Sequence, residues 1–288
     1  MKMSSNLVRD CSRHYSSELE KIYGSDEANA LIMILLEHYF SIDRVKIAME
    51  PELRLSESEL LTLHFAVKEL LKNKPIQYVL GETEFCGMKF FVEEGVLIPR
   101  PETEEMVRQL AVGHWPLAAK ILDIGTGSGC IAISLAKLLK DSVVTAVDVS
   151  EKALEIAKKN AAENDADVRF VLDDILNPKN PELIDNQYDI IVSNPPYVCE
   201  SEKSEMRANV LDYEPSSALF VSDNDPLIFY RKILEFAQKT LKPNGQIWFE
   251  INEKLGQEMQ NLCLEKGFKN VEIIKDFRGK DRILKVCR

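Results

Sequence analysis

Apolar residues recur at helical spacing through the first quarter of the chain. Residues 28–40 are apolar on most sides, which is typical of a helix in the centre of a bundle. Farther along, Ser56-x-x-Glu59 has the spacing of a helix-capping box, and Pro75 is expected to end the helix that follows. Within that helix, apolar residues recur every three or four positions, at Leu60, Leu63, Val67 and Leu71. The pattern predicts a small helical bundle, and we assign residues 1–75 to this domain.

The spacing of apolar residues changes between residues 76 and 98. Two short runs, Gln77–Leu80 and Met88–Val92, are separated by a segment that begins with Gly81. Short runs of this kind on either side of a turn are typical of a β-hairpin. We therefore expect residues 76–98 to form a β-hairpin linker between two domains.

From residue 99 onward, short apolar runs alternate with amphipathic stretches. Strands are expected at 120–124, 143–147, 168–172, 188–192, 246–251, 271–275 and 283–286. Helices are expected at 130–139, 151–160, 226–241 and 253–266. Such alternation predicts an α/β fold with a doubly wound, Rossmann-like and mostly parallel sheet, and we assign residues 99–288 to this domain. The loop before the last strand is too short for a parallel crossover, so we expect that strand to be antiparallel.

Composition excludes several classes of protein. The longest apolar run, Ala30–Leu36, is far shorter than the about 20 residues of a membrane-spanning helix. The first residues lack the apolar core of a secretory signal, and we expect a cytoplasmic protein. The cysteines form no Cys-x-x-Cys pair and have no histidine at zinc-ligand spacing, so no metal site is expected. A net charge of -11 argues against direct binding of nucleic acid, although a local basic patch stays possible at this point.

A glycine-rich loop separates the first predicted strand of the large domain from its first helix. The loop has the sequence Asp123-Ile-Gly-Thr-Gly-Ser-Gly129, so its candidate cofactor-binding residues are Asp123, Gly125, Thr126, Gly127, Ser128 and Gly129. Glycines at such a place allow the backbone to turn sharply and to approach a ligand. Dinucleotide sites use G-x-G-x-x-G, whereas this loop is G-x-G-x-G with an acid two residues before it. Because that acid would repel a pyrophosphate and suits an ammonium group, the loop favours S-adenosylmethionine over NAD.

Two further acids follow the next two strands. Asp148 ends the second strand, where a carboxylate can accept hydrogen bonds from both ribose hydroxyls. Asp174 follows the third strand, where an acid can meet an adenine amino group, although a solvated loop acid is an equally good interpretation. The glycine loop alone could be a tight turn that binds no ligand. Together with Asp123, Asp148 and the alternating strands and helices, it is better interpreted as a cofactor site.

The sequence Asn194-Pro-Pro-Tyr197 follows the strand predicted at 188–192. Pro195 and Pro196 fix the backbone and remove two donors, which leaves a corner rich in hydrogen-bond acceptors. Two acceptors can hold the two N–H bonds of a planar NH₂ group, and the ring of Tyr197 can pack against that plane. Such a clamp would aim an amide nitrogen at a methyl donor without a strong base. All histidines precede Trp115, so a Ser-His-Asp triad that takes its histidine from residues 115–288 is excluded.

These residues resemble a known family. Asn-Pro-Pro-Tyr after such a loop looks like the amino-methyltransferases, which act on adenine N6 or on glutamine. Three other groups of motifs resemble the PrmC (HemK) family, namely Lys74–Gly81 with Phe85-x-x-x-x-Phe90, Leu97–Glu104, and Tyr213–Leu219 with Asp276–Arg282. That family methylates the side-chain amide nitrogen of the glutamine in the Gly-Gly-Gln motif of class I peptide chain release factors. The resemblance implies this activity, S-adenosylmethionine as cofactor, and a helical N-terminal domain that docks the release factor.

The resemblance also implies roles for particular residues. Gly125 to Gly129, Asp148, Asp174 and Ile175 would contact the cofactor, and Asn194 would lie between the cofactor and the substrate. Pro195, Pro196 and Tyr197 would hold the substrate amide, and Arg100 and Glu102 would help to close the site. The chain departs from the family at Ile175, where an aromatic residue is common, and at Asn252, where glycine is common.

Three other functions stay open at this point. An N6-adenine methyltransferase needs the same clamp for an exocyclic NH₂ group, but the acidic charge and the motifs of the linker argue against it. A non-catalytic adaptor would not need an amine clamp. An NAD-dependent oxidoreductase is disfavoured by the spacing of the glycines and by Asp123.

Overall fold

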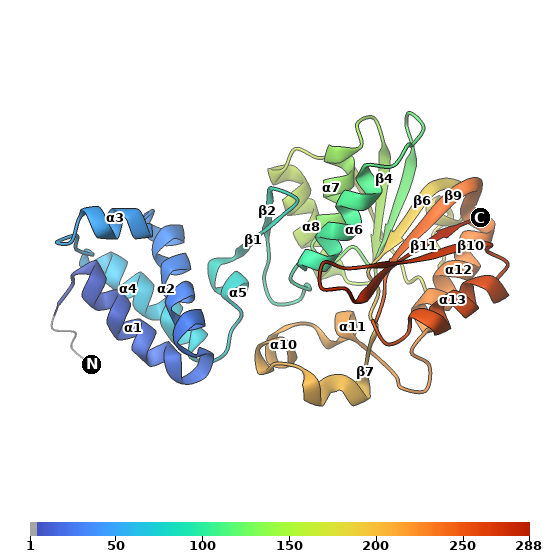
Figure 1. Cartoon of the computed structure of the whole chain (residues 1–288). Coiled ribbons are helices and arrows are strands. Elements are labelled where there is room, and N and C mark those ends of the chain that lie inside the picture. The colour runs from blue at the N-terminus through green and yellow to red at the C-terminus, as the bar shows by residue number, and fades with distance from the viewer. Residues whose placement is uncertain (1–4) are drawn as a thin grey trace. The chain divides into compact units, whose positions relative to one another are not determined.

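The computed structural model describes residues 5–288, which fold into two compact units (Figure 1). The first unit contains the described residues up to Gly81 together with Arg207–Tyr213, and the second contains Glu82–Met206 and Glu214–Arg288. Residues 1–4, which belong to the predicted helical domain and to the segment searched for a signal sequence, lie outside the described residues. None of the helices within residues 5–288 has the length and apolarity that a membrane crossing requires.

The first unit is a helical bundle. Its helices are α1 (Val8–Tyr23), α2 (Ser25–Phe40), α3 (Arg44–Met49), α4 (Glu57–Leu70), α5 (Ile76–Leu80) and, from later in the chain, α10 (Ala208–Tyr213). The apolar faces of α1, α2 and α4 form one core around residues such as Leu19, Leu35 and Leu63. The predicted capping box is confirmed, because the Ser56 hydroxyl accepts the backbone N–H of Glu59 while the Glu59 carboxylate accepts that of Ser56.

The predicted strand at Gln77–Leu80 is wrong, because this segment is the short helix α5. Val79 and Leu80 pack against the core of the bundle, and the N–H of Gly81 closes the helix on the carbonyl of Gln77. Gly81 has φ 76°, a left-handed conformation that suits a glycine after a helix. The hairpin lies just beyond it and consists of β1 (Glu82–Phe85) and β2 (Met88–Phe91). This apolar run is too short to show either a helical or a strand period, and its conformation is therefore decided by the packing of its side chains on the bundle.

A seven-stranded sheet forms the centre of the second unit. Its strands are β3 (Lys120–Ile124), β4 (Val143–Asp148), β5 (Val168–Leu172), β6 (Tyr188–Ser193), β9 (Leu241–Glu250), β10 (Asn270–Lys275) and β11 (Asp281–Cys287). The order across the sheet is β10-β11-β9-β6-β3-β4-β5. Strand β11 is antiparallel to both of its neighbours, whereas β3, β4, β5, β6 and β9 pair in parallel. The predicted doubly wound sheet with an antiparallel last strand is confirmed.

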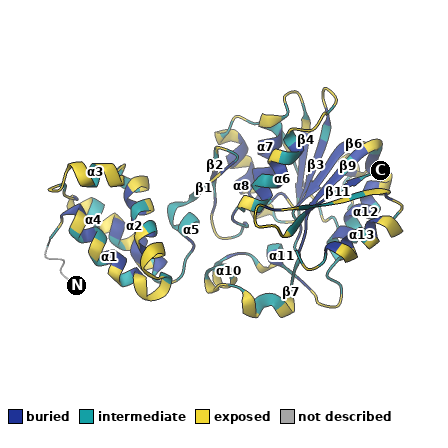
Figure 2. Ribbon diagram, in the orientation of Figure 1, coloured by how far each residue is buried: buried dark blue, intermediate teal, exposed yellow. Residues whose placement is uncertain are grey.

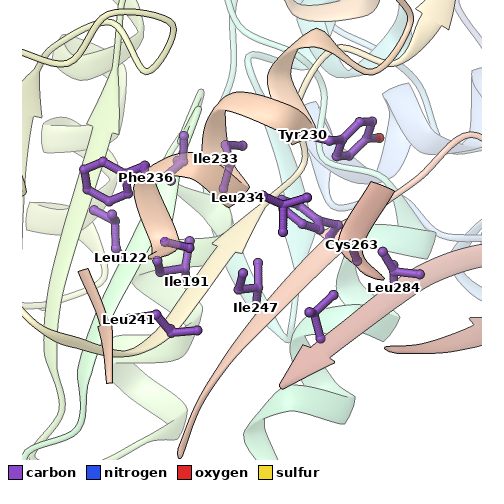
Figure 3. Packing of buried hydrophobic residues seen from close by; sticks show 14 of the residues in the cluster. Leu122, Ile191, Tyr230, Ile233, Leu234, Phe236, Leu241, Ile247, Cys263 and Leu284 are labelled. Carbon is purple, nitrogen blue, oxygen red and sulfur yellow. The ribbon is translucent and has the colours of Figure 1, made fainter. Parts of the chain in front are cut away.

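Consecutive residues of each strand face two separate cores. In β6, Ile190 packs on the core with helices α6 (Pro101–Ala111) and α7 (Cys130–Leu138), together with α8 (Glu151–Glu163). Ile191 packs on the opposite core with α12 (Ile228–Thr240) and α13 (Gly256–Glu265). Figure 3 shows that second core, where side chains of α12 lie over those of the strands. Both faces of the sheet are thus covered, and Figure 2 shows its central strands, such as β3 and β6, mostly in the colour of buried residues.

Several elements of the second unit do not follow from the predicted pattern. Helix α6 was not predicted, although Pro101 at its start, Glu102 and Glu104 in its first turn and the buried Met106 and Leu110 are helix signals. Strand β9 begins before the predicted residue 246. Small elements occupy the stretch after β6, namely β7 (Val198–Cys199), a 3₁₀ turn (Glu200–Glu205), α11 (Ser216–Leu219) and β8 (Phe220–Val221). A short helix, α9 (Pro181–Ile184), precedes β6.

Candidate active site

The segments that carry the predicted site residues all follow the carboxyl ends of parallel strands. The glycine loop follows β3, Asp148 ends β4, Asp174 comes after β5, and Asn194 follows β6. The strand order reverses at β3: β4 and β5 follow on one side of it, and β6 and β9 follow on the other. Ligands of open α/β sheets bind at the carboxyl ends of the strands where the order reverses. A cavity lies here, and eight of the predicted residues line it: Gly125, Gly127, Asp148, Asp174, Ile175, Asn194, Pro195 and Pro196.

The glycine loop leaves room for a ligand at two of its three glycines. Gly125 and Gly127 have φ 74° and 55°, and a Cβ atom on either would meet no other atom within 4 Å. Gly129 differs, because its Cβ would lie 2.9 Å from Cδ1 of Ile133 and 3.0 Å from Cβ of Ala157. The first two glycines therefore form an open cradle at the cavity, whereas the third permits close packing of α7 on α8.

Asp148 is held by the backbone and faces the cavity. Its Oδ2 accepts the N–H of Gly127 at 2.9 Å, and its Oδ1 accepts the N–H of Ser150 at 2.9 Å. Burial raises the pKa of this carboxyl group, while these backbone donors act in the opposite direction. A carboxylate has about four acceptor positions. Two of them stay available for hydroxyl groups of a ligand.

Asp123, Thr126, Ser128 and Gly129 are not among the residues that line the cavity. Asp123 is fully buried behind the loop, where its Oδ2 accepts the Thr126 hydroxyl at 2.6 Å. Its Oδ1 has no hydrogen-bond partner among the described residues. Burial raises the pKa of Asp123 to about 7, the Thr126 hydrogen bond lowers it, and the charge of Asp148 raises it further. Asp123 is thus a buried acid of the loop in this structure.

Asp174 and Ile175 lie at the far end of the cavity, after β5. The Asp174 carboxylate accepts the N–H of Leu176 at 2.9 Å, so the turn holds its orientation. Ile175 packs against the core beneath the cavity. A polar acceptor and an apolar side chain side by side suit the edge and the face of an adenine ring.

Asn194 belongs to a hydrogen-bond network that the sequence did not indicate. Its amide Nδ2 donates to the Thr103 hydroxyl at 3.1 Å, and that hydroxyl donates to Oε2 of Glu250 at 2.5 Å. The Tyr197 hydroxyl donates to Oε1 of the same carboxylate at 2.9 Å. Thr103 and Glu250 are both buried. Residues of α6, β9 and the loop after β6 therefore meet at one carboxylate.

The Tyr197 ring does not line the cavity. Its carbonyl accepts the amide N–H of Asn252 at 3.2 Å, and its hydroxyl is fixed by Glu250. Burial, with the charge of Glu250, raises the pKa of Tyr197 well above its usual value, so the hydroxyl keeps its proton. Asn252, the departure from the family pattern, thus helps to fix the backbone of Asn194–Tyr197.

Of the two residues proposed to close the site, Glu102 is half-buried in the first turn of α6, and Arg100 forms an ion pair with a buried glutamate. Arg100 donates to Oε1 of the buried Glu214 at 2.5 Å, and the other oxygen of that carboxylate accepts the N–H of Ile98 at 3.1 Å. This pair joins the segment before α6 to the segment before α11. Val96 and Leu97 on one side and Pro215 and Ser217 on the other line the cavity. Both segments belong to motifs that the sequence analysis identified, but only the fold shows that the two segments are in contact.

The residues present fit the expected S-adenosylmethionine. The open cradle at Gly125 and Gly127 leaves space for close approach to the backbone, and Asp148 keeps free acceptor positions. Asp174 and Ile175 offer contacts suited to adenine. No group of three His, Cys, Asp or Glu side chains among residues 5–288 is arranged to hold a metal ion. The glycine cradle, Asp148 and the pair Asp174–Ile175 together suit a nucleoside cofactor.

Comparisons with known proteins agree on the type of fold and on the relatives. Residues 103–213 match the family described as methyltransferase small domain, and residues 10–81 match the PrmC N-terminal domain. The release factor glutamine methyltransferase of Flavobacterium psychrophilum is 46% identical over 97% of this chain and 99% of its own length. The protein of the same description from Bacteroides thetaiotaomicron is 49% identical over 94% and 96%. A solved methyltransferase from Pyrococcus furiosus, 22% identical, shares the fold with a TM-score of 0.53, over 76% of this chain and 96% of that one.

Proposed function

The chain belongs to the release factor glutamine methyltransferase family, and we propose that its substrate is the glutamine of the Gly-Gly-Gln motif in class I peptide chain release factors. The enzyme is an S-adenosylmethionine-dependent methyltransferase that modifies the side-chain amide nitrogen of that glutamine. The observation that carries the proposal is the position of Asn194–Pro196 at the cavity, beside the cradle of glycines. Because release factors act in translation, we also propose the cytoplasm as the place of the reaction.

The cofactor supplies an electrophilic methyl group on a sulfonium centre. In the proposed site, Gly125 and Gly127 leave space for the cofactor, and the free acceptor positions of Asp148 would take the two ribose hydroxyls. Asp174 would accept a hydrogen bond from the adenine amino group, and Ile175 would pack on the ring, since both line the cavity. The other loop residues fix its shape: the Thr126 hydroxyl donates to Asp123, the Ser128 carbonyl accepts the amide of Asn160, and Gly129 lets α7 and α8 pack closely.

The substrate amide is held by acceptors on the loop after β6. Oδ1 of Asn194 and a carbonyl of Asn194 or Pro195 each take one N–H bond of the glutamine NH₂ group. Pro195 and Pro196 keep this corner rigid, and Tyr197 anchors it through Glu250. Orientation of this kind can contribute several kcal/mol to lowering a barrier. The developing positive charge on nitrogen is shared by the acceptors, and the proton leaves to solvent late in the reaction.

The helical unit is proposed to dock the release factor. We keep the division into a docking domain at residues 1–75, a linker at 76–98 and a methyltransferase domain at 99–288 as the working assignment. An N6-adenine methyltransferase would need the same clamp, but the relatives found and the acidic net charge of -11 favour the protein substrate.

A transfer assay with labelled S-adenosylmethionine tests the proposal. The acceptors are a class I release factor, the same factor with its Gly-Gly-Gln glutamine changed to alanine, and duplex DNA. We expect label in the first factor alone. Label in both factors would place the modified atom elsewhere, and label in DNA with none in the factor would overturn the proposed substrate.

A further inference from the structure

Four side chains next to the cavity form a continuous series of donors and acceptors. Glu250 lies at the buried end, Thr103 in the middle, and Asn194 at the end that lines the cavity. Tyr197 uses the second oxygen of Glu250. No residue of the described range donates to Oδ1 of Asn194, so this atom is available to a ligand.

The direction of each hydrogen bond follows from the carboxylate. An ionised carboxyl group can only accept, so the single proton of the Thr103 hydroxyl must point to Glu250. The Thr103 oxygen then has only lone pairs for Asn194, and its partner there must be a donor. The amide NH₂ end of Asn194 therefore faces Thr103, and the carbonyl end faces the cavity. An asparagine amide has two nearly isosteric ends, and this series selects one of them.

Burial raises the pKa of Glu250 overall, but the two hydroxyl groups that donate to its carboxyl oxygens favour the ionised form. The distance of 2.5 Å to Thr103 is typical of a hydroxyl that donates to a charged carboxylate. Burial raises the pKa of Glu250, while the Thr103 and Tyr197 hydroxyls and then the charge of Arg282 lower it, and Glu102 raises it. Tyr230 donates to the carbonyl of Glu250 at 2.8 Å, so it leaves both carboxylate oxygens to the other two hydroxyls.

We infer that Thr103, held by Glu250, is a positioning residue that keeps the acceptor end of the Asn194 amide turned toward the substrate nitrogen. The inference rests on the proposed function, because it specifies how that site recognises an NH₂ group. With the opposite orientation, Asn194 would present its own NH₂ group to the glutamine NH₂ group, and two donors repel. The same polarity disfavours a glutamate side chain in place of glutamine, since a carboxylate would meet an acceptor.

Matched variants of Thr103 test the hydroxyl separately from the shape. Thr103→Val keeps the branched side chain and removes the hydroxyl, while Thr103→Ser keeps the hydroxyl. Thr240→Val is the control for loss of a buried threonine hydroxyl elsewhere, because the Thr240 hydroxyl donates only to the carbonyl of Phe236 at 2.9 Å. We expect Thr103→Val to lower kcat on the release factor about 10–100-fold, somewhat less than removal of a whole transition-state contact. Thr103→Ser should stay within a few-fold of the wild type, and KM and cofactor affinity should change little in both variants.

A double-mutant cycle with Asn194→Ala distinguishes positioning from a structural role. If Thr103 acts through Asn194, Thr103→Val should lower single-turnover transfer little further when Asn194 is already alanine. Calorimetry with S-adenosylmethionine confirms that each variant is folded and binds the cofactor.

Three outcomes would overturn the inference. In the first, Thr103→Val lowers the rate of transfer by the same factor in the wild type and in Asn194→Ala. In the second, Thr103→Ser lowers kcat as much as Thr103→Val does. In the third, Thr103→Val keeps the wild-type kcat. If turnover by the Asn194→Ala protein is too slow to measure, the comparison of Val with Ser at position 103 decides alone. Failure of the proposed function has a different signature, because the wild-type enzyme itself would then leave the release factor unlabelled.

Discussion

A single buried acid behind the glycine loop makes the stability of the protein depend on pH. Burial raises the pKa of Asp123 to about 7, from an unperturbed 3.8. Between these values the folded chain holds a proton that the unfolded chain has released, so the favourable contribution is complete below about pH 4 and is lost as the pH rises through 7. Asp123→Asn cannot ionise. The free energy of unfolding of the wild type should therefore fall relative to that of the variant, by up to about 4 kcal/mol, between pH 4 and pH 7.

Urea unfolding of both proteins at a series of pH values measures this difference. The other carboxyl groups are shared and largely cancel, except for Asp148, whose charge acts on Asp123, and any fixed cost of the asparagine amide appears as an offset that does not change with pH. A difference between the two proteins that stays constant from pH 4 to pH 7 would show that folding does not raise the pKa of Asp123. The sequence indicated an acid at this position, but it did not show that the loop turns Asp123 inward and leaves Asp148 at the cavity.

At the scale of elements, two glycines with the same backbone conformation allow strain and packing to be separated. Gly129 before α7 has φ 84°, and Gly267 after α13 has φ 85°. A Cβ on Gly267 meets nothing within 4 Å, whereas one on Gly129 meets Ile133 and Ala157. Gly267→Ala should lose only the left-handed strain of about 1–2 kcal/mol. Gly129→Ala should lose about 1–3 kcal/mol more, because α7 and α8 must move apart. Equal midpoints and slopes in urea for the two variants would contradict the close approach of these helices.

The elements that the sequence predicts well are those that carry their own signal. Most strands of the sheet are short and rich in apolar residues, and β5 was predicted with its observed bounds of Val168–Leu172 although Arg169 interrupts it. Helix α5 has five residues, too few to show a helical period, and its conformation depends on the bundle against which Val79 and Leu80 pack. The network of Asn194, Thr103 and Glu250 joins residues up to 147 positions apart. Such a meeting follows from strand order, which a single sequence does not determine.

At the scale of the whole molecule, the helical unit takes one of its segments from the middle of the methyltransferase sequence. The Tyr213 hydroxyl donates to the carbonyl of Lys72 at 2.9 Å, and Arg207 pairs with Glu27 at 3.6 Å.

Deletion of residues 1–81 should therefore leave a folded unit that binds the cofactor, but in which the amides of residues 207–213 exchange rapidly with solvent. Its kcat/KM on an intact release factor should fall roughly 10-fold or more, if the bundle supplies docking contacts. A short Gly-Gly-Gln peptide is the matched substrate, because it has no docking surface to lose.

Cofactor affinity by calorimetry and hydrogen exchange by mass spectrometry measure the two parts of this prediction. Unchanged turnover of the intact factor by the shortened protein would exclude a docking role for the helical unit. Protection of residues 207–213 as strong as in the full chain would show that this segment does not need the bundle.

The position of the last strand has a consequence for synthesis on the ribosome. Strand β11 is the final element of the chain, yet it lies between β9 and β10 and not at an edge of the sheet. Its buried residues Ile283, Leu284 and Val286 complete the two cores, and β10 has no other partner in the sheet. A nascent chain that has made every earlier strand still exposes an unpaired edge at β9, the kind of edge that recruits other chains. The sheet can close only after β11 has left the ribosome, so the unit that carries the candidate active site keeps β9 unpaired on one side for as long as α13 and β10 are being synthesised.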